Sequence, residues 1–224
     1  MEPIQVKLIP REIREASFPI ARFISSEEEA KYKEALKQYS GKARDNLNVE
    51  SNIWKILLLN QIGIRTATLP ELESALENGL SLSGHCEDAR EVVLRTAEDS
   101  YPQNDYLAKS LTEQLKIKQF RSPLVVKGLE VVEDKKSDYG LAFKVNDKTE
   151  VIEALDFAHA NDLRKFIRIN PDYSVEFNDK GNRVLRTRPD GLSRACLDRD
   201  LDLYSWYMHL ADSGSDGRVV VVAA

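Results

Sequence analysis

The pattern of the chain changes at LVVKGLEVV (residues 124–132), directly after a Ser-Pro pair. β-Branched residues dominate this stretch, which predicts β structure. Further strand patterns follow at residues 140–145, 149–152, 173–177 and 183–188. The chain then closes with VVVV (residues 219–222), a continuous apolar run that predicts a strand buried on both faces. The second half of the chain is therefore expected to be α+β and mostly antiparallel.

Two hairpins and one helix are expected within this half. Asn146-Asp147 separates two strand patterns and is a two-residue turn signal, and residues 178–182 separate the next two. The helix is expected at about residues 155–167.

Helical signals dominate upstream, from about residue 25 to residue 118. Ser26-Glu27-Glu28-Glu29 predicts a capped helix that runs to Tyr39, with Gly41 as its stop. Thr68 is a second N-cap, followed by Pro70 and Glu71 in the first turn. The other expected helices cover residues 53–59 after Ser51, residues 83–94 from Ser83 or Gly84, and a segment from Asn104 with Leu107, Leu111 and Leu115 in one stripe. Together they predict a small helical bundle.

The expected architecture is thus α+β in two domains. A helical domain would span residues 1–122, and a ligand-display domain with a mostly antiparallel sheet and a buried C-terminal strand would span residues 123–224. No internal repeat is evident in the sequence.

Composition and charge narrow the class of protein. The chain has 224 residues, 42% of them hydrophobic, which is enough to bury a core and argues against disorder. A net charge of −5 argues against a general nucleic-acid binder. No apolar run approaches the ~18 residues of a membrane span, and no secretory signal pattern opens the chain. We therefore expect a soluble, cytoplasmic protein with no membrane span.

No metal or cofactor is expected. The three histidines and two cysteines are scattered, and Cys86 and Cys196 form no Cys-x-x-Cys motif. A long-range disulfide between them is one alternative, and reduced thiols are favoured in a cytoplasmic protein. Aspartates at 198, 200 and 202 are a poor match to a calcium loop, because Leu203 replaces its glycine and His209 its final glutamate.

The most unusual stretch is LDRDLDLYSWYMHLADSGSD (residues 197–216). Its first part alternates, so an extended chain would place Leu197, Leu201 and Leu203 on one face and three aspartates on the other. Aromatic residues beside Ser, Gly and Asp are typical of antibody-like binding loops. The alternative is that the aromatics pack beneath a long loop and the aspartates are solvated.

Residues 197–222 resemble the variable region of proteins diversified by retroelements, in which a reverse transcriptase copies a template with errors at adenines. Template Asn codons then become Asp, Tyr, Ser, His, Gly or Cys codons, while other codons stay fixed. The resemblance implies a fixed frame of Leu197, Arg199, Leu201, Leu203, Leu210, Ala211, Gly217, Arg218 and the valine run. It implies a variable, ligand-binding surface of Asp198, Asp200, Asp202, Tyr204, Tyr207, His209, Asp212, Ser213, Ser215 and Asp216, with Trp206 as a further anchor.

This resemblance also implies a C-type-lectin-like fold for the second half and a function in recognition rather than catalysis. The partner would be a protein or other macromolecule of unknown identity. The helical half would mediate homo-oligomer assembly or attachment to another protein. Substitutions at Asp202, Tyr204 or Tyr207 would then change stability by no more than ~0.5 kcal/mol. Truncation of Leu203 or Val220 would cost ~2 kcal/mol or more.

Two alternatives come from other classes. A basic cluster of Arg183, Arg186, Arg188, Arg194 and Arg199 could bind nucleic acid, although interspersed carboxylates favour a salt-bridged sheet face. An enzyme could use Cys86 near a helix start or Asp156 and His159 as an acid–base pair. A buried cysteine and a surface pair are the simpler explanations of those residues.

Overall fold

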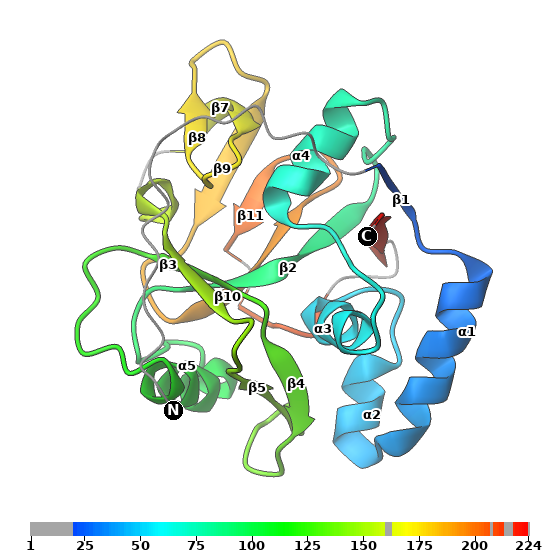
Figure 1. Cartoon of the computed structure of the whole chain (residues 1–224). Coiled ribbons are helices and arrows are strands. Elements are labelled where there is room, and N and C mark those ends of the chain that lie inside the picture. The colour runs from blue at the N-terminus through cyan, green and yellow to red at the C-terminus, as the bar shows by residue number, and fades with distance from the viewer. Residues whose placement is uncertain (1–19, 160–162, 207, 213–216, 224) are drawn as a thin grey trace.

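The computed structural model describes residues 20–159, 163–206, 208–212 and 217–223, which contain five α-helices and 13 strands. The α+β class and the mostly antiparallel sheet are confirmed (Figure 1). The helices are α1 (Ser26–Ala35), α2 (Gly41–Leu47), α3 (Ile53–Gln61), α4 (Leu69–Glu77) and α5 (Pro102–Gln114), with 3₁₀ turns at Leu36–Gln38 and Leu155–Phe157. The strands are β1 (Ala21–Phe23), β2 (Cys86–Leu94), β3 (Leu124–Lys127), β4 (Glu130–Glu133), β5 (Leu141–Lys144), β6 (Glu150–Glu153), β7 (Arg164–Ile169), β8 (Val175–Phe177), β9 (Arg183–Thr187), β10 (Leu192–Leu197), β11 (Leu203–Ser205), β12 (Gly217–Arg218) and β13 (Val220–Val222).

One nine-stranded sheet organises the molecule, in the order β6-β3-β2-β10-β11-β9-β7-β8, with β12 also paired to β2. Most neighbours are antiparallel, and the parallel pairs are β9 with β11 and β2 with β12. β4 pairs with β5 and β1 with β13 in two small sheets outside it. β2 precedes the expected domain boundary at residue 122, whereas both of its main neighbours, β3 and β10, follow it.

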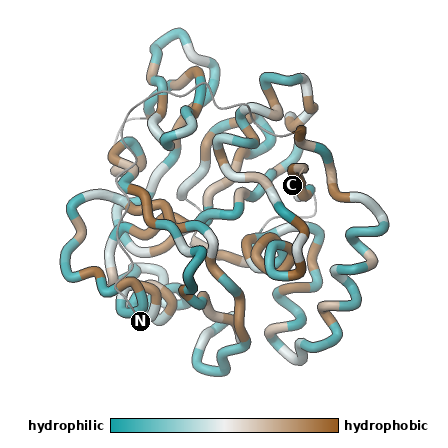
Figure 2. Tube along the Cα trace, viewed as in Figure 1, coloured by the Kyte–Doolittle hydropathy of each residue, from teal (hydrophilic) through white to brown (hydrophobic). Residues whose placement is uncertain are grey.

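The central strands β2 and β10 are buried on both faces of the sheet. Successive residues of β2 point to opposite sides, and Val92 packs with α3 and α5 while Val93 packs with α4 and Phe157. In Figure 2 the tube is hydrophilic along much of the outer helix α1 and strongly hydrophobic along β3 near the centre. Because both faces are covered, every residue of β10 is buried, polar ones included.

Several predicted helices are confirmed, with small shifts at their ends. Thr68 caps α4 in a capping box with Glu71, and α5 buries Leu107 and Leu111. The cap of α1 is Ser25, one residue earlier than expected, and Asn52 rather than Ser51 caps α3. Gly41 does not stop a helix but opens α2, which the sequence analysis missed.

The helix predicted for residues 83–94 is wrong, because this segment forms the central strand β2. Its β-branched Val92-Val93 pair suits a strand, and its charged residues are buried in pairs instead of lining a helix surface. The expected bundle is not confirmed, since α4 packs on the side of Val93 whereas α5 packs on the side of Val92.

The two predicted hairpins are also wrong. β5 pairs with β4 while β6 pairs with β3, so the turn at Asn146-Asp147 joins two different sheets. β7 lies between β8 and β9 and pairs with both of them, so β8 and β9 do not form the predicted hairpin. The helix predicted at residues 155–167 is wrong in the described residues, because Leu155–Phe157 form a 3₁₀ turn and residues 164–167 belong to β7.

The C-terminal valines are buried, as predicted, but their strand is not part of the large sheet. β13 pairs with β1, and Phe23 lies opposite Val220. No helix within the described residues is long and apolar enough to cross a membrane.

Candidate functional site

The segment that resembles a variable region begins as a tight hairpin. β10 and β11 pair with Cys196 opposite Tyr204 and Leu197 opposite Leu203. The expected extended alternation through residues 198–202 is wrong, because the chain turns there, with Leu201 at a φ of +65°. A carboxylate oxygen of Asp198 accepts hydrogen bonds from the backbone N–H groups of Asp200 and Asp202, both at 3.0 Å, so one side chain stabilises the turn.

Asp202 has a second structural contact. Its carboxylate accepts a 2.6 Å hydrogen bond from the backbone N–H of Val184 and lies 3.5 Å from Nε of Arg186. The residue is only 7% exposed. We therefore expect its substitution to cost more than the ~0.5 kcal/mol of a free surface position, because the partly buried N–H of Val184 would lose its acceptor.

A pocket of about 490 Å³ opens beside β9 and β11. Its lining combines two aromatic side chains, two aliphatic side chains, a cation and two polar groups. These residues are His159, Leu163, Leu185, Arg186, Thr187, Tyr204 and Trp206.

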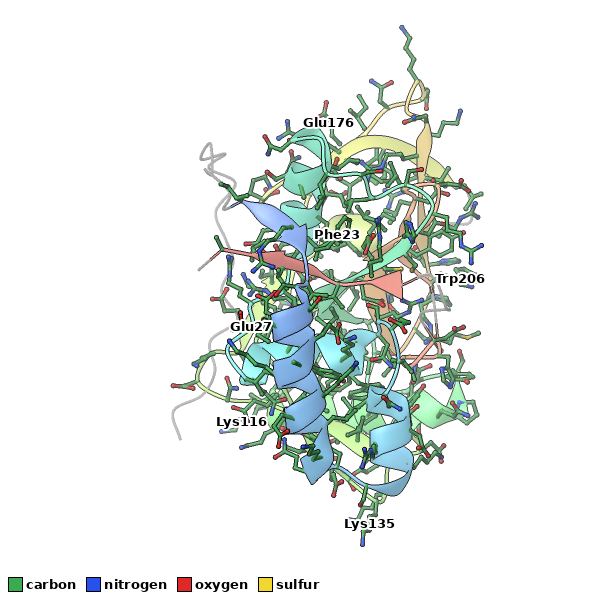
Figure 3. The ribbon with its side chains drawn as sticks, turned by 90° about the vertical axis from the view of Figure 1, so that its right-hand side faces the viewer. Phe23, Glu27, Lys116, Lys135, Glu176 and Trp206 are labelled. Atoms are coloured by element: carbon green, nitrogen blue, oxygen red, sulfur yellow. The ribbon has the colours of Figure 1, made fainter. Side chains whose placement is uncertain are left out.

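Each aromatic residue of the pocket contacts a neighbouring side chain and is partly exposed to solvent. The guanidinium of Arg186 lies over the Tyr204 ring, 5.3 Å from its centroid. Trp206 follows the end of β11 and is 46% exposed, and in Figure 3 it lies at the outer edge of the molecule. The Trp206 and His159 rings lie 6.1 Å apart, and Nδ1 of His159 is 2.9 Å from the carbonyl oxygen of Thr187. The pocket thus offers aromatic contact area on a sheet that fixes the backbone.

Arg186 is the cation of this pocket. Its side chain is 34% exposed, although its Nε is buried 3.5 Å from a carboxylate oxygen of Asp202. Partial burial raises the pKa of Tyr204 further above its ordinary value of 10. The exposed part of the Arg186 guanidinium can donate hydrogen bonds to an anionic or carbonyl group beside an apolar contact.

The remaining predicted positions are spread over the neighbouring loop. His209 packs against the rings of Tyr101 and Tyr139, and its Nδ1 is buried without a hydrogen-bond partner in the described part of the chain. Asp200 and Asp212 are exposed. Tyr207, Ser213, Ser215 and Asp216 lie outside the described residues. The structure thus brings Tyr204 and Trp206 together in the pocket, while the side chain of Asp198 stabilises the turn and that of Asp202 contacts β9.

Most of the arginine cluster is buried rather than displayed. Arg183 pairs with Glu73 at 2.7 Å, Arg188 pairs with Asp99, and Arg194 pairs with Asp88, and these three arginine side chains are 2–6% exposed. Arg199 is exposed on the turn. Buried, paired guanidinium groups cannot contact a phosphate backbone, so the three arginines provide no nucleic-acid surface.

The residues of the enzyme alternative each have other partners. Asp156 accepts a hydrogen bond from the N–H of Val175 at 2.9 Å, whereas His159 faces Thr187 at the pocket. Cys86 is buried in the sheet beside Cys196. The described residues contain no group of three or more His, Cys, Asp or Glu that could hold a metal ion.

Sequence reasoning missed His159, Leu163, Leu185 and Thr187 as partners of Tyr204 and Trp206, and placed Arg186 in a different site. Alternation in residues 183–187 puts Leu185 and Thr187 on the face opposite Arg186 and does not indicate that the three line one pocket. The parallel pairing of β9 with β11 is a long-range contact that no local pattern indicates. No model of a known family matches this chain, and no significantly similar curated protein or solved structure was found.

Proposed function

We propose that this protein is a non-catalytic binding protein and that the pocket beside Tyr204 and Trp206 contacts its partner. The observation that carries the proposal is the exposure of Trp206, at 46%, next to a strand whose Leu203 is 0% exposed. Large aromatic residues are enriched where partners bind, because they supply contact area at a small cost in conformational entropy. A half-exposed tryptophan on a rigid strand end has this character.

The chemistry of the pocket favours a protein partner that inserts an apolar or aromatic side chain next to a carboxylate. Trp206, Tyr204 and Leu163 provide the apolar walls. Arg186 provides donors at the rim, since its pairing with Asp202 at 3.5 Å leaves it 34% exposed. A planar guanidinium binds a carboxylate with two parallel hydrogen bonds, which would fix the orientation of the inserted side chain.

We also propose that this surface is diversified by a retroelement. Burial in the segment supports the proposal: the frame residues Leu197, Leu203 and Leu210 are 0% exposed, while Asp200 and Asp212 are exposed and Tyr204 is partly so. The C-type-lectin-like character that the resemblance implies belongs to the same proposal. A display segment followed by the buried strand β13 supports it.

The binding proposal is tested by selection from a random peptide library displayed on phage. The wild-type chain is the target, and the Trp206→Ala variant is used to remove peptides that bind elsewhere. Enrichment of peptides with an aromatic residue near Asp or Glu is expected, with binding weakened at least tenfold by Trp206→Ala. Ile167→Ala is the matched control, because Ile167 is 45% exposed but does not line the pocket. Equal losses for both variants, or no enrichment, would refute the assignment.

The diversification proposal is tested on DNA. The region around the 3′ end of the gene should contain a near-copy of the codons for residues 197–222, together with a reverse-transcriptase gene. The copy should differ from the gene only where the copy has adenine. Differences at other bases, or no copy at all, would refute diversification and leave the binding proposal to stand on the peptide experiment.

A further inference from the structure

Two cysteines that are far apart in the sequence meet in the centre of the sheet. Cys86 opens β2 and Cys196 is near the end of β10, and these strands lie side by side (Figure 1). Their sulfur atoms are 3.6 Å apart, and both residues are free thiols. Cys196 lies opposite Asp88, two positions along the strand from Cys86, so the two cysteines are diagonal neighbours on the same face.

The surroundings of the two thiols differ from an ordinary apolar core. A guanidinium nitrogen of Arg194 lies 3.8 Å from the sulfur of Cys86, and this arginine is held in place by Asp88. The hydrogen bond between Cys86 and Cys196 lowers the pKa of Cys86, and the positive charge of Arg194 acts in the same direction. The same hydrogen bond, together with burial, raises the pKa of Cys196. Cys86 is therefore the thiol that ionises first and the stronger candidate for a nucleophile.

The two cysteines also differ in access. Residues 83 and 84, directly before β2, are exposed, and Cys86 retains 9% exposure. Cys196 is 0% exposed. A small reagent that reaches the start of β2 would meet Cys86, while Cys196 would be reached only through Cys86.

We propose that Cys86 and Cys196 form a reversible dithiol–disulfide site that exchanges with low-molecular-weight disulfides of the glutathione type. The Cys86 thiolate attacks one sulfur of the small disulfide, forms a mixed disulfide and releases the first small thiol. The sulfur of Cys196, after losing its proton, then attacks the sulfur of Cys86. The bond to the small molecule breaks, and a second small thiol leaves with that proton. Two electrons pass from the protein to the small disulfide, which is reduced to two thiols.

The cross-link would join strands that belong to distant parts of the chain. Cys196 lies directly opposite Tyr204 of the pocket, so the bond would anchor the hairpin that carries the aromatic residues to β2. The site does not depend on the proposed binding function. A disulfide that closes so long a loop restricts the unfolded chain strongly and should raise the melting temperature by roughly 5–10 °C.

The test uses the folded, fully reduced chain treated with oxidised glutathione and measured by intact mass spectrometry. The wild-type chain should lose the mass of two hydrogens without gaining glutathione, and a digest should contain a peptide that links Cys86 to Cys196. Reduction should restore the original mass and the lower melting temperature. Two free thiols after the treatment, or a bond between two chains on a non-reducing gel, would overturn the proposal.

Single variants separate the roles of the two thiols. Cys196→Ser should accumulate one glutathione on Cys86, because the second thiol that would displace it is gone. Cys86→Ser should stay unmodified, because Cys196 has no access to the reagent. Cys86→Ala and Cys196→Ala serve as replacements if a serine variant does not fold. Equal glutathione addition to both variants would contradict the assigned order of attack, even if the wild-type disulfide forms.

Discussion

Arg194 and Arg186 lie on β10 and β9 of the same sheet, with β11 between them, and they differ in exposure to solvent. Arg194, on β10, has a side chain that is 2% exposed and pairs with Asp88, whose side chain is 0% exposed. Arg186, on β9, is 34% exposed, stacks over Tyr204 and lies 3.5 Å from Asp202. The first arginine is part of the interior, whereas the second faces the pocket.

The difference shows how one residue type takes two roles according to depth in the sheet. Removing one partner of a buried ion pair leaves an uncompensated charge, which is strongly destabilising. At a partly exposed position water screens the charge, so the same change has a small effect on stability and can act on binding instead. The centre formed by β2 and β10 should therefore govern stability, and the pocket beside β9 and β11 should govern recognition.

The largest expected effect is at the buried pair. Asp88→Asn leaves the guanidinium of Arg194 buried without its carboxylate and should lower the free energy of unfolding by about 3–5 kcal/mol. Urea denaturation followed by tryptophan fluorescence measures this loss. Glu34→Gln is the control, because Glu34 pairs with Lys37 on an exposed helix surface, and it should change the free energy by no more than about 0.5 kcal/mol. Similar losses in both variants would remove the distinction between the two environments.

The second-largest effect on stability is expected at Leu203, on the strand that supports the pocket. Leu203→Ala removes a fully buried side chain from β11 and should cost about 2–4 kcal/mol through the cavity that it leaves. The same urea titration measures it. A loss below about 1 kcal/mol would mean that β11 is not a rigid support for Tyr204 and Trp206.

The buried centre should also make the stability of the protein depend on pH. Burial raises the pKa of Glu91 to about 7, from an ordinary value of 4.5. The folded protein then holds a proton that the unfolded chain releases, so stability should fall as the pH rises from about 4.5 to about 7 and change little above that range. One such group gives a slope of about 1.4 kcal/mol per pH unit.

Glu91→Gln tests that assignment. The amide keeps an oxygen for the N–H of Leu69, 3.1 Å away in the wild type, and for the hydroxyl of Tyr173. The variant should lose the share of the slope that Glu91 contributes, while Glu87, whose pKa burial also raises to about 7, keeps its own share. Urea denaturation at a series of pH values measures both chains. An unchanged slope in the variant would show that Glu91 is ionised in the folded protein.

The smallest effect on stability is expected in the pocket itself. Trp206→Ala should change the free energy of unfolding by no more than about 0.5 kcal/mol, because the side chain is 46% exposed. Calorimetric melting of this variant beside Leu203→Ala measures the contrast between neighbouring residues of one segment. A loss comparable to that of Leu203→Ala would make Trp206 part of the core.

The sequence predicted local features well and long-range ones poorly. Capping signals at Thr68 and the leucine stripe of α5 determine their helices within a few residues, so both could be found. β2 could not, because Glu87, Asp88 and Glu91 suggest a surface, and their partners come from distant segments. The pocket was half predicted: Tyr204 and Trp206 are two residues apart in the sequence, but their neighbours on β9 and near His159 depend on strand pairing.

The position of β11 within the sheet also affects whether substitutions of its side chains would promote aggregation. β11 has a neighbour on each side, β10 and β9, so its backbone N–H and C=O groups are not free to pair with another chain. An exposed edge strand that gained aromatic residues would be a template for aggregation. An interior strand carries that hazard only through its side chains. Hydrophobic or aromatic substitutions at position 204 would therefore carry little risk that copies of the protein associate through their sheets.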